Sequence, residues 1–135
     1  MDYYLYELNQ DQVRRDEILK KYCKELDQTE GEDVHSFSQL SIKGLNLLIS
    51  ENFIPMDERQ NKSPSFRTIA DFVNKYPRFK VSGYAVDLSR SDYRISIDKI
   101  QVRGHYLEAW HEFSKLFAEA DDLYGDSRIQ YAWYD

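Results

Sequence analysis

Two stretches of the chain carry the pattern Glu-x-x-His, Glu32–His35 and Glu108–His111. On a helix this spacing places both side chains on one face, and di-iron carboxylate proteins use two such pairs as inward-pointing ligands. The second pair lies about 200° and 140° around a helix from Tyr106, which belongs to the apolar stripe, so both side chains should face water. The first pair follows Gly31 in the least regular stretch of the chain. We therefore expect no metal ion at either pair.

The other motifs that carry catalysis or hold cofactors fail on spacing. His111 and Glu112 begin like a zinc-protease helix, but the second histidine would have to stand where Lys115 does. The single cysteine, Cys23, excludes an internal disulfide and the cysteine-rich zinc folds. All five glycines are isolated, so the chain has neither a Gly-rich phosphate loop nor a Gly-x-Ser-x-Gly elbow. Cys23 could be a nucleophile, but its place at the margin of an apolar helix face favours a structural thiol. We expect no cofactor.

Charge is the most informative feature of the sequence. The chain has a formal net charge of −6, whereas residues 59–103 carry ten Lys and Arg against four Asp and Glu. These basic residues alternate with aromatic ones, which predicts one positive, Tyr-rich face on a negative body. Such a face determines which partners are attracted and how fast. The residues expected to contact a partner are Arg78, Lys80, Tyr84, Arg90, Tyr93, Arg94, Lys99 and Arg103.

Three classes of function fit this pattern, and a fourth interpretation assigns it none. The first, which we favour, is a small acidic protein-interaction module without catalysis, comparable in size and charge to inhibitors, immunity proteins and antitoxins. The second is a nucleic-acid-binding module that uses the basic, aromatic hairpin 79–103. The third is a small enzyme whose site assembles only in the fold. Alternatively, the cations pair with acidic helices and form ordinary salt bridges.

Length and composition are those of one globular domain over residues 1–135, since 41% of the residues are hydrophobic and 31% are charged. No apolar run approaches the roughly 20 residues that span a bilayer, and the start lacks the order of a secretory signal. The sequence therefore predicts a cytoplasmic protein without a membrane partner.

Apolar periodicity predicts four helices. They cover Gln12–Gln28, capped by Asp11; Ser36–Asn52, with Gly44 inside it; a helix capped by Ser63 with Pro64 at its first position, ended by Pro77; and His105–Ala120. The segment Tyr3–Leu8 fits either a strand or a helical turn.

A period of two predicts strands at Phe79–Leu88 and Tyr93–Val102, joined by the loop Ser89–Asp92. The apolar phase changes before Ile100, which indicates either a bulge near Asp98 and Lys99 or two partly covered faces. A last strand follows at Ile129–Tyr134, and it could leave an unpaired edge through which two copies associate.

The fold class expected is α+β. Three N-terminal helices should precede an antiparallel β-hairpin, a helix and a final strand, and the strands should form one small sheet packed against the helices.

Overall fold

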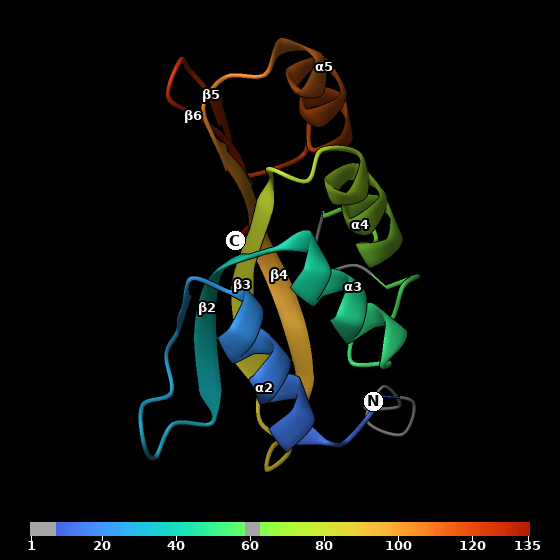
Figure 1. The fold of residues 1–135 in the computed structure, drawn as a ribbon, viewed down its shortest axis with the longest axis vertical. Coiled ribbons are helices and arrows are strands. Elements are labelled where there is room, and N and C mark those ends of the chain that lie inside the picture. Colours follow the sequence, from blue (N-terminus) through green and yellow to red (C-terminus); the bar gives the residue numbers. More distant parts are fainter. Residues whose placement is uncertain (1–7, 59–62) are drawn as a thin grey trace.

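The computed structural model describes residues 8–58 and 63–135 (Figure 1). Within these residues the chain forms four helices and six strands. In chain order they are α2 (Gln12–Tyr22), β1 (Glu25–Leu26), β2 (Val34–Leu40), α3 (Ile42–Ser50), α4 (Phe66–Lys75), β3 (Lys80–Val86), β4 (Arg94–Arg103), α5 (Leu107–Leu116), β5 (Asp122–Gly125) and β6 (Ile129–Trp133). The segment Tyr3–Leu8 lies outside the described residues except for Leu8, which is buried.

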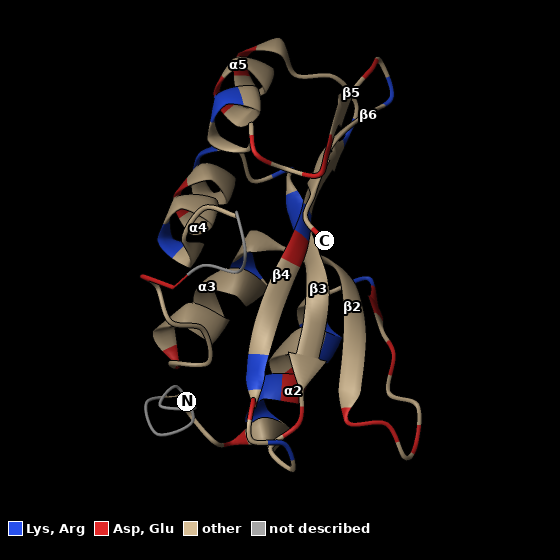
Figure 2. Ribbon diagram, turned by 180° about the vertical axis from the view of Figure 1, so that it is seen from behind, with Lys and Arg blue, Asp and Glu red and all other residues tan. Residues whose placement is uncertain are grey.

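The strands form one antiparallel sheet in the order β1-β2-β3-β4-β6-β5. In Figure 1, α2 lies in front of the strands and α3, α4 and α5 follow one another along one side of them; in Figure 2, seen from behind, the strands lie in front of α2. The helices of the described chain therefore cover one face of the sheet and leave the other face open. The α+β class and the single sheet are confirmed, but the expected order of elements is wrong, because β1 and β2 lie between the first two helices.

The predicted helix Ser36–Asn52 is in fact a strand followed by a helix, β2 and α3. The register of β2 against β3 shifts between Phe37 and Leu40, and Gln39 has a left-handed φ of 54°. This bulge turns both Phe37 and Leu40 into the core. The strand therefore shows the i, i+3 spacing that is typical of a helix.

The first helix ends at Tyr22 rather than near Gln28, because Cys23 is extended and the chain turns into β1, where the Lys24 N–H donates to the Ser38 carbonyl at 2.9 Å. Its predicted cap is confirmed, since Asp11 Oδ1 accepts from the Arg14 N–H. A Cβ on Gly44 would lie 2.6 Å from the Tyr22 Cβ, so this glycine allows α3 to pack closely on α2.

The helix predicted to begin at Ser63 and Pro64 begins two residues later. Ser65 is the cap of α4, and its side chain accepts from the Thr68 N–H at 3.2 Å. The helix ends at Lys75 with Tyr76 as its cap residue, just before Pro77, as a helix that meets a proline must.

The predicted β-hairpin and its bulge are confirmed by β3 and β4. Ser82 pairs with Lys99 and Gly83 with Ile97, which leaves Asp98 as the extra residue. Because of this bulge, the apolar residues on both sides of it face the helices. They are Ile95, Ile97, Ile100 and Val102.

The C-terminal part contains the predicted helix, shortened to α5, and the predicted last strand, β6. In β6 the larger apolar and aromatic residues do not face the core, as they would in an ordinary core strand. Gln130 and Ala132 are buried under the helices, while Ile129, Tyr131 and Trp133 point to the side of the sheet that no described helix covers. The strand β5, which the sequence did not predict, pairs with the outer side of β6. The edge strand on this side of the sheet is therefore β5, not β6, and the opposite edge strand is β1.

The core lies between the sheet and the helices. Its centre is Phe72 of α4, whose ring centroid is 4.9 Å from that of Phe79, 5.4 Å from Phe113 and 5.6 Å from Phe117. These edge and tilted contacts join α4 and α5 to the start of β3. Among the described helices, none has the length and apolar character needed to cross a membrane.

Candidate functional site

The open face of the sheet is built by the strand residues that point away from the helices. Cross-strand partners share a face, so the register assigns its members: Ser36 of β2; Lys80, Ser82 and Tyr84 of β3; Arg94, Ser96, Lys99, Gln101 and Arg103 of β4; Ile129, Tyr131 and Trp133 of β6; and Asp122 and Tyr124 of β5. We call this set the open face. Its alternate neighbours on β3 and β4, such as Val81 and Ile100, are buried beneath the helices.

Aromatic rings and a cation stack across β4, β6 and β5. The rings of Tyr124 and Tyr131 have centroids 5.5 Å apart, and Lys99 Nζ lies 4.9 Å from the centroid of Tyr131. The Tyr131 hydroxyl donates to Asp122 Oδ2 at 2.7 Å, and this hydrogen bond, followed by desolvation, raises the pKa of Tyr131. Trp133 is 39% exposed. The rings are thus held in place but remain accessible from the open side.

The predicted contact residues divide into two groups. Lys80, Tyr84, Arg94, Lys99 and Arg103 belong to the open face, and Arg78 lies just before β3. Tyr93 instead lies in the core, 2% exposed, with its hydroxyl donating to the Asn9 carbonyl at 2.7 Å. Tyr93 is therefore not on the surface that the sequence prediction gave it.

At the tip end of the hairpin, where β3 leads into β4, the cations are paired. Arg90 donates Nε to Asp92 Oδ1 at 2.8 Å and Nη2 to Oδ2 at 2.9 Å. Arg94 Nη1 also donates to Asp92 Oδ2, at 2.8 Å, and Arg94 Nη2 donates to the Tyr84 hydroxyl at 3.3 Å. The hydrogen bonds from Arg90 and then Arg94 lower the pKa of Asp92. These two arginines are thus in salt bridges, but with Asp92 of the hairpin loop and not with the acidic helices of the alternative interpretation.

At the base end of the hairpin, where β3 begins and β4 ends, four cations line one hollow of about 240 Å³. They are Arg78, Lys80, Arg103 and Arg128. Arg78 Nη1 donates to the Tyr106 hydroxyl at 2.6 Å, but none of the four forms an ion pair with any described residue. The base end thus carries four positive charges. Among the described residues, Asp126 is the carboxylate that partly compensates one of them, since the Tyr124 hydrogen bond and, less strongly, the charge of Arg128 lower the pKa of Asp126.

Arg128 is the residue that the sequence prediction missed at the base end. It belongs to the acidic last segment, and only the pairing of Arg103 with Ile129 brings it beside β4. Gly104 makes this approach possible, because its N–H donates to the Arg128 carbonyl at 2.6 Å while its φ of 107° lies where glycine is favoured. The charge of Arg128 was visible in the sequence, but its neighbours were not.

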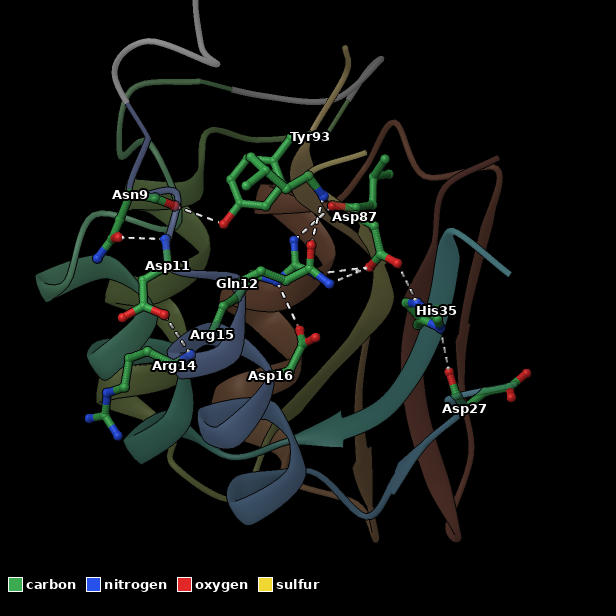
Figure 3. Close-up of polar contacts among 12 residues, drawn as sticks. Asn9, Asp11, Gln12, Arg14, Arg15, Asp16, Asp27, His35, Asp87 and Tyr93 are labelled. Atoms are coloured by element: carbon green, nitrogen blue, oxygen red, sulfur yellow. Dashed lines mark hydrogen bonds and ion pairs between the residues drawn. The ribbon is translucent and has the colours of Figure 1, made fainter. Parts of the chain in front are cut away.

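On the other side of the sheet, a buried network joins α2 to β2 and the end of β3 (Figure 3). Arg15 is 1% exposed and donates Nη1 to the Val86 carbonyl at 2.7 Å, with ion pairs to Asp16 at 3.0 Å and Asp87 at 3.5 Å. Its guanidinium carbon lies 4.9 Å from the centroid of the Tyr93 ring. The network holds the helix layer to the tip end of the hairpin.

His35 is the titrating member of this network, at 3.0 Å from Asp87 Oδ2 and 3.0 Å from the Asp27 carbonyl. Burial alone would lower its pKa, but the hydrogen bond and charge of Asp87 outweigh burial and raise it. Both ring nitrogens face acceptors, so the protonated imidazolium donates twice. Neither nitrogen is left to act as a general base, and the pair is structural rather than catalytic.

The remaining candidate groups offer no chemistry of their own. The Cys23 thiol donates to the Glu25 carbonyl, and burial raises the pKa of this thiol, which is the opposite of activation. Glu108 and His111 are exposed on α5, as expected. Within residues 8–58 and 63–135, no three His, Cys, Asp or Glu side chains converge in a group that could hold a metal ion.

No protein-family model matches this chain. Neither a curated protein nor a solved structure is significantly similar to it.

Proposed function

We propose that the protein is a non-catalytic binding module whose open face docks an acidic surface of another protein. The observation that carries the proposal is the one-sided covering of the sheet, which leaves Trp133 exposed with Tyr131 and Lys99 half-buried beside it. Such a module would act by binding alone, as inhibitors, immunity proteins and antitoxins do. A partner would complete the second layer that the sheet lacks.

The charges of the sheet favour an acidic partner. Lys80, Lys99 and Arg103 lie along the central strands of the open face, whereas Glu25 and Asp122 lie on the edge strands. A complementary surface would place carboxylates over the centre, and this pattern would both speed association and fix its orientation. A basic partner would instead be attracted by the acidic loop 27–33, which carries Asp27, Glu30, Glu32 and Asp33 beyond β1.

A protein partner also fits this face better than a nucleic acid does. Nucleic-acid affinity grows with the number of phosphates that cations neutralise, and here the tip-end arginines are already paired with Asp92. The overall charge of −6 opposes the approach of a polyanion. Tyr, Trp and Arg, by contrast, are the residues that dominate the energetics of protein interfaces.

Site-specific photocrosslinking in source cells tests the proposal. A photoreactive phenylalanine analogue in place of Tyr131 should give one dominant protein adduct, and the same analogue in place of Val13 is the matched control. Val13 is 73% exposed on α2, in the helix layer. The adduct at position 131 should disappear when Lys99→Glu and Arg103→Glu are combined, and the captured protein should present a carboxylate-rich surface.

Other adducts would contradict the proposal in defined ways. A nucleic-acid adduct at position 131 would mean that the open face binds a nucleic acid and not a protein. Equal adducts at positions 131 and 13 would exclude the open face as the specific surface.

Truncation of the Trp133 side chain sharpens the test once the crosslinked protein is identified. Trp133→Ala should weaken the purified complex about thirtyfold, since truncation of an aromatic hot spot costs roughly 2 kcal/mol or more. Surface plasmon resonance measures the change. Trp133 is 39% exposed, so the fold should tolerate this substitution, and an unchanged melting temperature would verify that.

A further inference from the structure

The base end of the hairpin gathers four cations around one hollow that no described carboxylate lines. The hollow of about 240 Å³ is lined by Arg78, Lys80, Arg103 and Arg128 together with Gln101 and other uncharged residues. No described aspartate or glutamate lines it. Asp126 lies close to Arg128, but its oxygens accept from the Arg128 and Ile129 N–H groups and from the Tyr124 hydroxyl. The Tyr124 hydrogen bond lowers the pKa of Asp126 most, and the charge of Arg128 helps to lower it.

Four like charges around one hollow repel one another unless an anion enters. Guanidinium groups match the geometry of phosphate and carboxylate, and charge-assisted hydrogen bonds are stronger than neutral ones. A dianionic phosphoryl group compensates several cations at once, whereas a carboxylate carries a single charge. The charge count at the base end therefore favours a phosphoryl group.

A second, larger hollow of about 620 Å³ adjoins the first, and the two share Arg78 and Tyr106 as lining residues. Its lining is largely apolar and includes Tyr76, Phe79 and Leu107. The Leu107 side chain is 62% exposed. The volume lies in the range of small-molecule sites, which bury an apolar body and orient it with a few polar groups.

The charges of the larger hollow give a bound ligand one orientation. Glu108 lines it, and Lys75 on its rim is paired with Glu112 at 2.6 Å. An anion is thus disfavoured on this side and favoured on the other side of the Arg78–Tyr106 pair. The apolar part of a ligand would lie beside α5, and its anionic end would lie beside β3 and β4.

We propose that the two adjoining hollows form one site for a small organic phosphate. Its phosphoryl group is bound by Arg78, Lys80, Arg103 and Arg128, and its aromatic or aliphatic body packs against Tyr76, Pro77 and Leu107. The smaller hollow shares Lys80, Gln101 and Arg103 with the open face, but the proposal is carried by the two hollows and their cations and does not depend on a protein partner.

Calorimetric titration of the full chain tests the site with three matched probes. 1-Naphthyl phosphate carries both parts of the ligand, inorganic phosphate carries the head alone, and 1-naphthol carries the body alone. The complete probe should bind at one site per chain, about tenfold or more tightly than either part, because each hollow adds contacts that the other lacks. Absence of saturable 1-naphthyl phosphate binding at millimolar concentration would overturn the proposal, as would equal affinity for inorganic phosphate.

Variants then assign the two halves. Arg103→Gln combined with Arg128→Gln should weaken both phosphates about tenfold or more, whereas Leu107→Ser should weaken 1-naphthyl phosphate and leave inorganic phosphate unchanged. The matched control is Arg90→Gln, at the tip end of the same hairpin, where affinity should not change. If the double variant keeps the wild-type melting temperature and still binds with wild-type affinity, the assignment is wrong.

Two further experiments distinguish a small phosphate ligand from a nucleic acid, and the organic-phosphate site from the protein-docking face. A 5′-phosphorylated oligonucleotide should bind no more tightly than the corresponding mononucleotide, and tighter binding would overturn the assignment to a small ligand. Trp133→Ala should leave 1-naphthyl phosphate binding intact while it weakens the protein complex. Failure of the organic-phosphate site thus does not imply failure of the open face, nor the reverse.

Discussion

The β3–β4 hairpin carries arginines at both ends, but only those at the tip end are paired with carboxylates. Arg90 and Arg94 share Asp92, and Asp87 at the same end pairs with Arg15 and His35. At the base end, Arg78 and Arg103 form no ion pair with the described residues. One ribbon thus holds two kinds of cation, and the difference is set by which segments pack beside each end.

This comparison shows what a local excess of positive charge can and cannot reveal. At the tip end the cations hold helix, strand and loop together, so their removal should reduce stability. At the base end the cations repel one another and should be retained for binding rather than for the fold. Stability measurements and binding measurements should therefore separate the two ends.

The largest stability effect is expected for Arg15→Met. The methionine fills similar volume but removes the buried partner of Asp87 and leaves the Val86 carbonyl without its 2.7 Å donor. Breaking a buried pair costs roughly 3–5 kcal/mol; since Asp87 keeps His35 and Gln12 as partners, we expect about 3 kcal/mol. The free energy of unfolding in urea measures it.

The matched control for Arg15 is its neighbour on α2. Arg14 pairs with Glu51 at 2.7 Å, but its side chain is 42% exposed, so water compensates for the loss. Arg14→Met should therefore cost much less. Equal losses for the two variants would show that burial at the tip end is not what makes Arg15 matter.

The sequence predicts structure well where the pattern is local and poorly where pairing is distant. The bulge at Asp98 could be predicted, because the apolar phase changes within one strand. The strand β2 could not be predicted, because the bulge at the left-handed Gln39 gives its buried residues the three-residue spacing of a helix. For the same reason the base end was only partly predicted: Arg78 and Arg103 belong to the basic stretch, whereas Arg128 arrives through the β4–β6 pairing.

The second prediction concerns pH and the tip end. Because the folded state raises the pKa of His35, its contribution to stability is complete below the unfolded value of about 6.5 and is lost as pH rises through the folded value. Replacement of a charge-assisted hydrogen bond by a neutral one should lower the free energy of unfolding by about 1 kcal/mol. Urea titrations between pH 5 and 8, chosen to bracket that range, measure the fall.

Two histidine variants locate the origin of this fall. His35→Asn should remove it, whereas His111→Asn, at an exposed position on α5, should leave it in place. If His35→Asn retains the full pH dependence, Asp87 does not stabilise a charged His35, and the tip end is held by Arg15 alone.

The smallest expected effects are those of single arginine substitutions on the free energy of unfolding. They distinguish the two ends most directly, because the change should be a loss at the tip end and a gain at the base end. Arg90→Gln removes a two-pronged ion pair with Asp92, so the free energy of unfolding should fall by a few tenths of a kcal/mol, up to about 1 kcal/mol. Arg103→Gln removes one of four like charges, so the free energy of unfolding should rise by a few tenths of a kcal/mol at low salt. Both differences should shrink as salt screens the charges. A loss of stability with Arg103→Gln would mean that the base end also supports the fold, because only an attractive contact of Arg103 could be lost in that way.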